Sequence, residues 1–147
     1  MIMTLHEHTR PVRVGALTIG GGSRIAVQSM TNTDTADREA TLRQILALEG
    51  AGCDIVRCTV NGREAVRSIG YLKERCGVPL VADIHFDYRL ALEAVAAGID
   101  KIRINPGNIG DAGRVRKVAD ACARAGIPIR IGVNGGSLEG LLLAKYG

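Results

Sequence analysis

The stretches KIRINPGNIG (residues 101–110) and PIRIGVNGGSLE (residues 128–139) decide the fold that we predict for this chain. In each stretch a short β-branched run is followed by a turn rich in asparagine and glycine, after which helical periodicity begins. Such a run predicts a strand that leads directly into a helix. Strands and helices that alternate along a chain indicate a parallel sheet with right-handed crossovers.

The same pattern occurs three more times on the N-terminal side, so the sequence predicts five βα units with no linker between them. Glycines follow the helical runs, where a left-handed residue is favoured, and Asp87 and Ser137 stand where their side chains can cap the next helix. The predicted strands are Ala26–Met30, Cys53–Val60, Pro79–His85, Lys101–Asn105 and Pro128–Asn134, and the predicted helices are Asp37–Glu49, Arg63–Cys76, Tyr88–Ala97, Ala112–Ala125 and Leu138–Tyr146.

The turn after the first predicted strand distinguishes between two α/β folds. A doubly wound nucleotide-binding fold carries a glycine-rich phosphate turn there, whereas SMTNTDT (residues 29–35) contains no glycine. We therefore predict a TIM-type (β/α)8 barrel, which needs about 250 residues when complete. Within the 147 residues of this chain, we expect residues 26–147 to form the N-terminal five βα units of an incomplete barrel. An N-terminal hairpin or ribbon is expected over residues 1–25.

The composition excludes several classes of protein. Hydrophobic residues make up 46% of the chain, as in ordinary globular proteins, while aromatic residues make up 3%, which disfavours modules that stack on nucleic-acid bases. No apolar run reaches the roughly 20 residues of a membrane helix and no signal peptide is evident, so we expect a cytoplasmic protein with no membrane partner. The four cysteines lack metal-ligand spacing, so we expect buried thiols and no metal site. The net charge of +4 favours an anionic partner.

Polar residues of the predicted strands share one face of the sheet. Successive side chains of a strand point to opposite faces, and the alternate positions hold apolar residues such as Val56, Ile84 and Ile104. Active sites of barrels form at the C-terminal ends of the strands, so the polar residues are candidates for a binding site. These residues are Arg57, Asp83, Arg103, Asn105, Arg130 and Asn134, with His85 at a strand end and Ser137 in a loop as further possible site residues.

Two interpretations of the strand arginines stay open. Arg57 or Arg103 can form an internal salt bridge with Asp83. Three arginines nevertheless outnumber one carboxylate, and the planar guanidinium suits phosphate, so we favour an anion site. Glycine-rich turns after the arginine-bearing strands add backbone N–H donors. His85 is either an acid/base group or a partner for the backbone.

Five motifs of this chain match one family. VQSMTNTDT (27–35), DIVRCTV (54–60), VADIHFD (81–87) and the two stretches quoted first resemble the 4-hydroxy-3-methylbut-2-enyl diphosphate synthases. These are iron–sulfur enzymes of the non-mevalonate isoprenoid pathway, and the resemblance covers their N-terminal part. It implies a (β/α)8 barrel that binds 2-C-methyl-D-erythritol 2,4-cyclodiphosphate and a C-terminal domain that carries a [4Fe–4S] cluster. It also implies a homodimer that opens the ring reductively with electrons from flavodoxin or ferredoxin.

The resemblance assigns roles to the candidate residues. The family's diphosphate-binding arginines fall on Arg57, Arg103 and Arg130, and its polar substrate contacts fall on Asp83, Asn105 and Asn134. The family's cluster ligands and later barrel strands have no counterpart in this chain, so we expect the chain alone to lack the redox step. We assign no catalytic residue within the chain itself.

Two other classes of function stay open. One is a cluster-free barrel for phosphorylated or pterin-like ligands, related to dihydropteroate synthase. The other is a non-catalytic half-barrel that serves as an assembly module. Nucleic-acid binding is disfavoured because the best-placed arginines lie in strands rather than on an outer helix.

Overall fold

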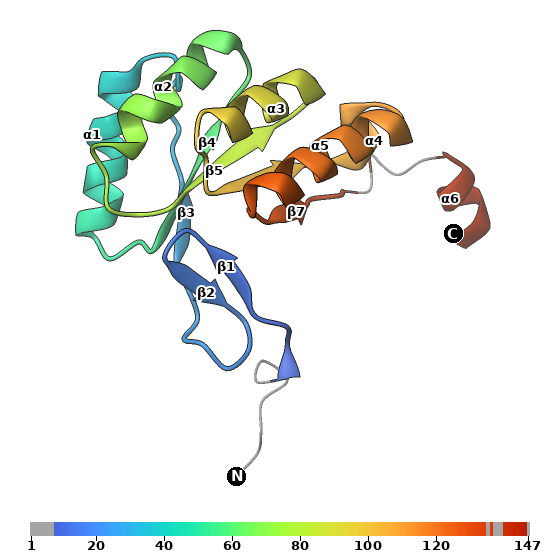
Figure 1. Cartoon of the computed structure of the whole chain (residues 1–147), viewed down its shortest axis with the longest axis horizontal. Helices are drawn as coiled ribbons and strands as arrows, with labels where there is room; N and C mark the ends of the chain where they lie inside the picture. The colour runs from blue at the N-terminus through green and yellow to red at the C-terminus, as the bar shows by residue number, and fades with distance from the viewer. Residues whose placement is uncertain (1–7, 135, 137–139, 147) are drawn as a thin grey trace.

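The fold is a parallel sheet covered by helices, with a hairpin beside it (Figure 1). The computed structural model describes residues 8–134, 136 and 140–146. Within these residues, no helix has both the length and the apolar character that crossing a membrane requires. Strands β3 to β7 form one sheet in sequence order, while β1 and β2 pair with each other antiparallel. The strands are β1 Val12–Val14, β2 Leu17–Ile19, β3 Gln28–Met30, β4 Ile55–Thr59, β5 Leu80–Ile84, β6 Lys101–Ile104 and β7 Ile129–Ile131.

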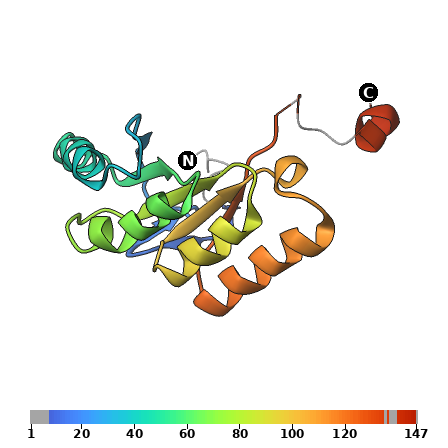
Figure 2. The ribbon, with the colours of Figure 1, turned by 90° about the horizontal axis from the view of Figure 1, so that it is seen from above.

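All four pairings within the five-stranded sheet are parallel, and helices connect its successive strands. Seen from above, α2, α3 and α5 lie side by side along the outer face of the sheet (Figure 2). This architecture confirms the predicted α/β fold and the five βα units of an incomplete barrel. The helices are α1 Arg38–Gly50, α2 Arg63–Lys73, α3 Tyr88–Ala96, α4 Pro106–Ile109, α5 Ala112–Ala125 and α6 Gly140–Tyr146.

Helix ends follow the capping chemistry of the sequence. The carboxylates of Asp37, Asp87 and Asp111 each accept a hydrogen bond from a backbone N–H in the first turn of α1, α3 and α5. Gly126 ends α5 in the left-handed conformation, with φ of 67°. Ser137, predicted to cap the last helix, lies outside the described residues.

The observed elements differ from the predicted ones mainly at their ends. Each strand of the parallel sheet is shorter than predicted, because a strand ends where pairing with its neighbour ends. Helix α2 ends at Lys73 rather than Cys76, since the chain tightens into a turn in which the N–H groups of Arg75 and Cys76 share the Leu72 carbonyl. Helix α4 was not predicted. Asn105 caps it and Pro106 supplies a preset φ at its first position.

The main core lies between the sheet and the helices. It contains the residues of β4, β5 and β6 that alternate with the polar ones, and the apolar faces of the covering helices. Val56, Ile84 and Ile102 are each fully buried there. The polar residues of the same strands consequently face the opposite side of the sheet, as the alternation predicts.

A second, smaller core lies on the inner face of the sheet, at the N-terminal ends of the strands. Val14 of the hairpin packs there against Ile55 and Val81, and all three are at most 1% exposed. Asp54 ties this region together, because its carboxylate pairs with the Arg24 guanidinium and accepts the N–H of Val27. The hairpin therefore closes the N-terminal end of the inner face and leaves the C-terminal end open for a site.

Candidate anion-binding site

Asp83 is the centre of the charged cluster on the inner face. This residue of β5 is 3% exposed, and one of its carboxylate oxygens, Oδ1, accepts a hydrogen bond of 3.0 Å from Nη1 of Arg103 on β6. Its other oxygen, Oδ2, lies 3.4 Å from Nε of Arg57 on β4. His85 Nε2 lies 3.6 Å from Oδ1. The structure thus brings three other predicted site residues, Arg57, His85 and Arg103, together around the Asp83 carboxylate.

The register of the sheet explains this arrangement. Asp83 pairs with Arg103 across β5 and β6, and Arg103 pairs with Arg130 across β6 and β7. Parallel neighbours in register project to the same face at the same height, so Asp83, Arg103 and Arg130 form one row. Arg57 stands one layer nearer the hairpin, where it pairs with Val81, and its longer side chain reaches back to Asp83.

Positive charge exceeds negative charge in this cluster. Arg130 is exposed, and no carboxylate in the described part of the chain lies within ion-pair distance of it. Lys101 shares the polar side of β6 and is half-buried. Burial, together with the charge of Arg130, lowers the pKa of the Lys101 ammonium. Asp83 pairs with Arg57 and Arg103, so it leaves the charges of Arg130 and Lys101 unbalanced within the described part of the chain.

Both interpretations of the arginines have a structural counterpart. Arg57 and Arg103 form the internal ion pairs with Asp83, while Arg130 and Lys101 supply charge that this carboxylate does not balance. Guanidinium groups that are already oriented cost less entropy when an anion binds. The ion pairs with Asp83 therefore fix the orientation of two of the three arginines.

Asn105 has a structural task that the sequence did not reveal. It is 2% exposed, and its side-chain oxygen accepts the N–H of Gly107 at 3.1 Å, which caps α4. Asn105 thereby fixes the turn that follows the arginine-bearing strand β6. Asn134, by contrast, is exposed beyond β7, and Ser137 lies outside the described residues.

Two residues of the site escaped sequence reasoning. Gly132 follows β7, its carbonyl accepts Arg103 Nη2 at 3.4 Å, and a Cβ at this position would lie 2.6 Å from that nitrogen. A glycine inside a strand-like run is the signal that marks such a close approach. Met30, at the end of β3, contacts Arg57 through its sulfur. No motif distinguishes a methionine in this role from one that fills a core.

The described residues of the chain do not fit the iron–sulfur cluster that the resemblance implies. No group of three or more His, Cys, Asp or Glu among them is placed to hold a metal ion. Cys53, Cys58 and Cys122 are buried, and burial raises the pKa of both Cys58 and Cys122 to about 11. A thiol ligand must lose its proton, so these two cysteines are poor ligands at neutral pH.

The fold and the charged inner face define part of a TIM-type barrel with a cationic mouth. A family model described as the GcpE TIM-barrel domain matches residues 9–147. The 4-hydroxy-3-methylbut-2-en-1-yl diphosphate synthase (flavodoxin) of Bacillus mycoides (strain KBAB4) is 57% identical over 145 residues, as is the protein of the same name from Bacillus anthracis. The chain therefore belongs to the GcpE family. It spans 40% of the length of these relatives.

Solved structures with a similar fold include two dihydropteroate synthases. The Yersinia pestis enzyme has a TM-score of 0.65 and 18% identity, over 92% of this chain and 51% of its own. The Xanthomonas albilineans enzyme with 4-aminobenzoic acid has a TM-score of 0.64 and 18% identity, over 92% of this chain and 56% of its own. At this identity the likeness shows a shared fold only.

Proposed function

We propose that this chain forms the diphosphate-binding part of a 4-hydroxy-3-methylbut-2-enyl diphosphate synthase. The substrate would be 2-C-methyl-D-erythritol 2,4-cyclodiphosphate, whose ring the complete enzyme opens reductively. The observation that carries the proposal is the row of Asp83, Arg103 and Arg130 on the inner face, with Arg57 beside it. The similarity to the Bacillus synthases supports the same assignment.

The chain's own residues would bind and orient the substrate. Guanidinium groups form paired hydrogen bonds with phosphate oxygens, and donors that are fixed before binding stabilise charge that develops on a diphosphate leaving group. Asp83 holds Arg57 and Arg103 in place, and Gly132 lets Arg103 approach the end of β7. Asn105 fixes the adjacent turn. Asn134 is proposed to contact the substrate, and His85 beside Asp83 is a further candidate contact.

The redox part of the reaction is assigned to residues outside this chain. We propose that a [4Fe–4S] cluster is held elsewhere in the complete enzyme and that flavodoxin or ferredoxin donates the electrons. Flavodoxin is named in the descriptions of the Bacillus relatives. We also propose that the complete enzyme is a homodimer, as the resemblance implies, and that it acts in the cytoplasm, as expected from the sequence.

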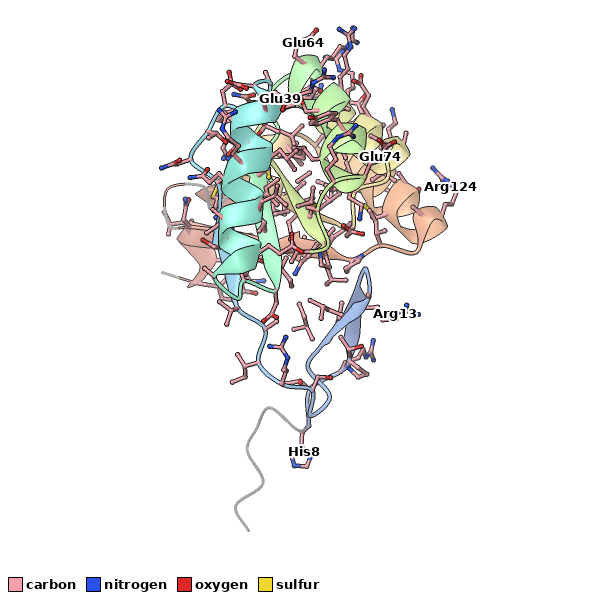
Figure 3. The ribbon with its side chains drawn as sticks, turned by 90° about the vertical axis from the view of Figure 1, so that its left-hand side faces the viewer. His8, Arg13, Glu39, Glu64, Glu74 and Arg124 are labelled. Atoms are coloured by element: carbon pink, nitrogen blue, oxygen red, sulfur yellow. The ribbon has the colours of Figure 1, made fainter. Side chains whose placement is uncertain are left out.

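Calorimetric titration of the complete enzyme with the cyclic diphosphate tests this function. Arg103→Ala removes a charged hydrogen bond and should weaken binding by about 1.5–3 kcal/mol. The matched control is Arg124→Ala, because Arg124 lies at the outer end of α5, far from the inner face (Figure 3). Unchanged affinity in folded Arg103→Ala, or an equal loss in Arg124→Ala, would overturn the proposal.

A further inference from the structure

We propose that Met30 is a positioning residue of the anion site, in which its thioether sulfur holds the guanidinium of Arg57. This inference rests on the proposed function, because it concerns how one of the proposed diphosphate ligands is oriented. Met30 lies at the end of β3 and pairs in register with Arg57 of β4. The two side chains therefore project from neighbouring strands to the same face at the same height.

The contact is made along one edge of the guanidinium. Nε and Nη2 of Arg57 donate to the Met30 sulfur at 3.3 and 3.1 Å. Nε also lies 3.4 Å from Oδ2 of Asp83. Two neighbours on two different strands thus fix the plane of the guanidinium. Its third nitrogen, Nη1, makes no hydrogen bond with the described part of the chain, so it is left to meet a ligand.

The chemistry of sulfur suits this task. A thioether is a weak and uncharged acceptor, so it directs the N–H groups without neutralising the guanidinium. A second carboxylate at this position would cancel the positive charge that a diphosphate needs. A hydrocarbon side chain of the same size would fill the space but accept no hydrogen bond. Met30 therefore orients Arg57 and preserves its charge.

The location of Met30 makes the orientation important. The Arg57 side chain is 22% exposed, so packing alone does not restrain its guanidinium. Arginine carries several rotatable bonds, and each one left free must be ordered when a ligand binds. Holding the guanidinium beforehand reduces that cost.

The test compares two variants of the complete enzyme with inorganic pyrophosphate as the probe. Met30→Leu keeps the volume and removes the acceptor, and it should weaken pyrophosphate binding about fivefold, since the two lost hydrogen bonds to sulfur are weak. Met30→Gln restores an uncharged acceptor and should recover most of that affinity. Leu46→Gln, at an exposed apolar residue of α1, is the matched control and should bind like the wild type.

A spectroscopic readout separates orientation from folding. In the ligand-free wild type, the Arg57 Nε–H should give a protected NMR signal that is lost in Met30→Leu and regained in Met30→Gln. If the wild-type protein does not bind pyrophosphate, the proposed function is wrong. The contact between Met30 and Arg57 is then tested by the Arg57 Nε–H signal alone. Wild-type affinity together with an unchanged Arg57 signal in Met30→Leu would overturn the inference.

Discussion

Asp83 pairs with both Arg57 and Arg103, although the two arginines stand on the strands on either side of it. The carboxylate is almost completely buried, while each arginine side chain is about one-fifth exposed. The single negative charge of Asp83 is therefore the counter-charge of two guanidinium groups at the open end of the inner face. We therefore expect stability and the proposed anion affinity to be coupled through Asp83.

We expect Asp83→Asn to destabilise the protein by about 2–3 kcal/mol, because two partly buried guanidinium groups lose their counter-charge. Pyrophosphate should then raise the melting temperature less in the variant than in the wild type, since Arg57 and Arg103 lose the carboxylate that orients them. Thermal unfolding with and without pyrophosphate measures both effects. Equal ligand-induced shifts in the two proteins would show that Asp83 does not orient the arginines for the anion.

Arg130 should behave in the opposite way. It has no carboxylate within ion-pair distance among the described residues, so we expect Arg130→Ala to change stability by no more than about 0.5 kcal/mol. Pyrophosphate affinity should fall about tenfold, and the pKa of Lys101 should rise because Arg130 no longer repels its charge. Calorimetry and an NMR titration of labelled lysines measure these changes. A loss of stability comparable to that of Asp83→Asn would contradict the prediction.

Lys101→Met should stabilise the ligand-free protein at neutral pH, because it removes a half-buried ammonium beside Arg130. The folded pKa of Lys101 lies below its ordinary 10.5, so folding disfavours its charged form. The resulting penalty is full below the folded pKa and disappears as the pH rises to 10.5. The stability difference between variant and wild type should therefore shrink over that window, which denaturant unfolding at a series of pH values would measure. A stability difference that stays constant with pH would contradict the prediction that charged Lys101 destabilises the folded protein.

Lowering the pH should weaken the contacts that Asp54 makes with Arg24 and Val27, in the segment after the hairpin. The Arg24 guanidinium and the Val27 N–H hold the pKa of Asp54 at about 2, below its ordinary 3.8. A lowered carboxyl pKa contributes stability above 3.8 that is lost as the pH falls towards 2. Asp54→Asn should be less stable than the wild type at pH 7, and the gap should close below pH 3. Urea unfolding at several pH values tests this, and a gap that persists at pH 2 would count against the assignment.

The two ends of the inner face should separate stability from binding. Ile55 is 1% exposed against the hairpin, and Ile55→Ala should destabilise the protein by about 2–5 kcal/mol. Folded Ile55→Ala should keep wild-type pyrophosphate affinity. Denaturant unfolding measures the loss of stability, and calorimetry measures the affinity. A large loss of affinity in folded Ile55→Ala would contradict the prediction.

Much of the fold follows from local sequence signals. The alternation in KIRIN and PIRIG predicts which residues face the helices, and Ile102 and Ile104 are buried there as expected. The ends of the elements were predicted less well. The strands are shorter than their β-branched runs because a strand requires a paired neighbour, and the last turn of α2 was overestimated.

The sequence by itself determined the βα order, the polar and apolar faces of the strands, and the arginines that share one face, because alternation and capping are local properties of the chain. Only the tertiary structure decided that Asp83 serves two arginines, that Met30 contacts Arg57 and that Asn105 caps α4. The first two depend on strand register, which joins residues at least 20 positions apart in the chain. The third depends on backbone geometry that composition does not specify.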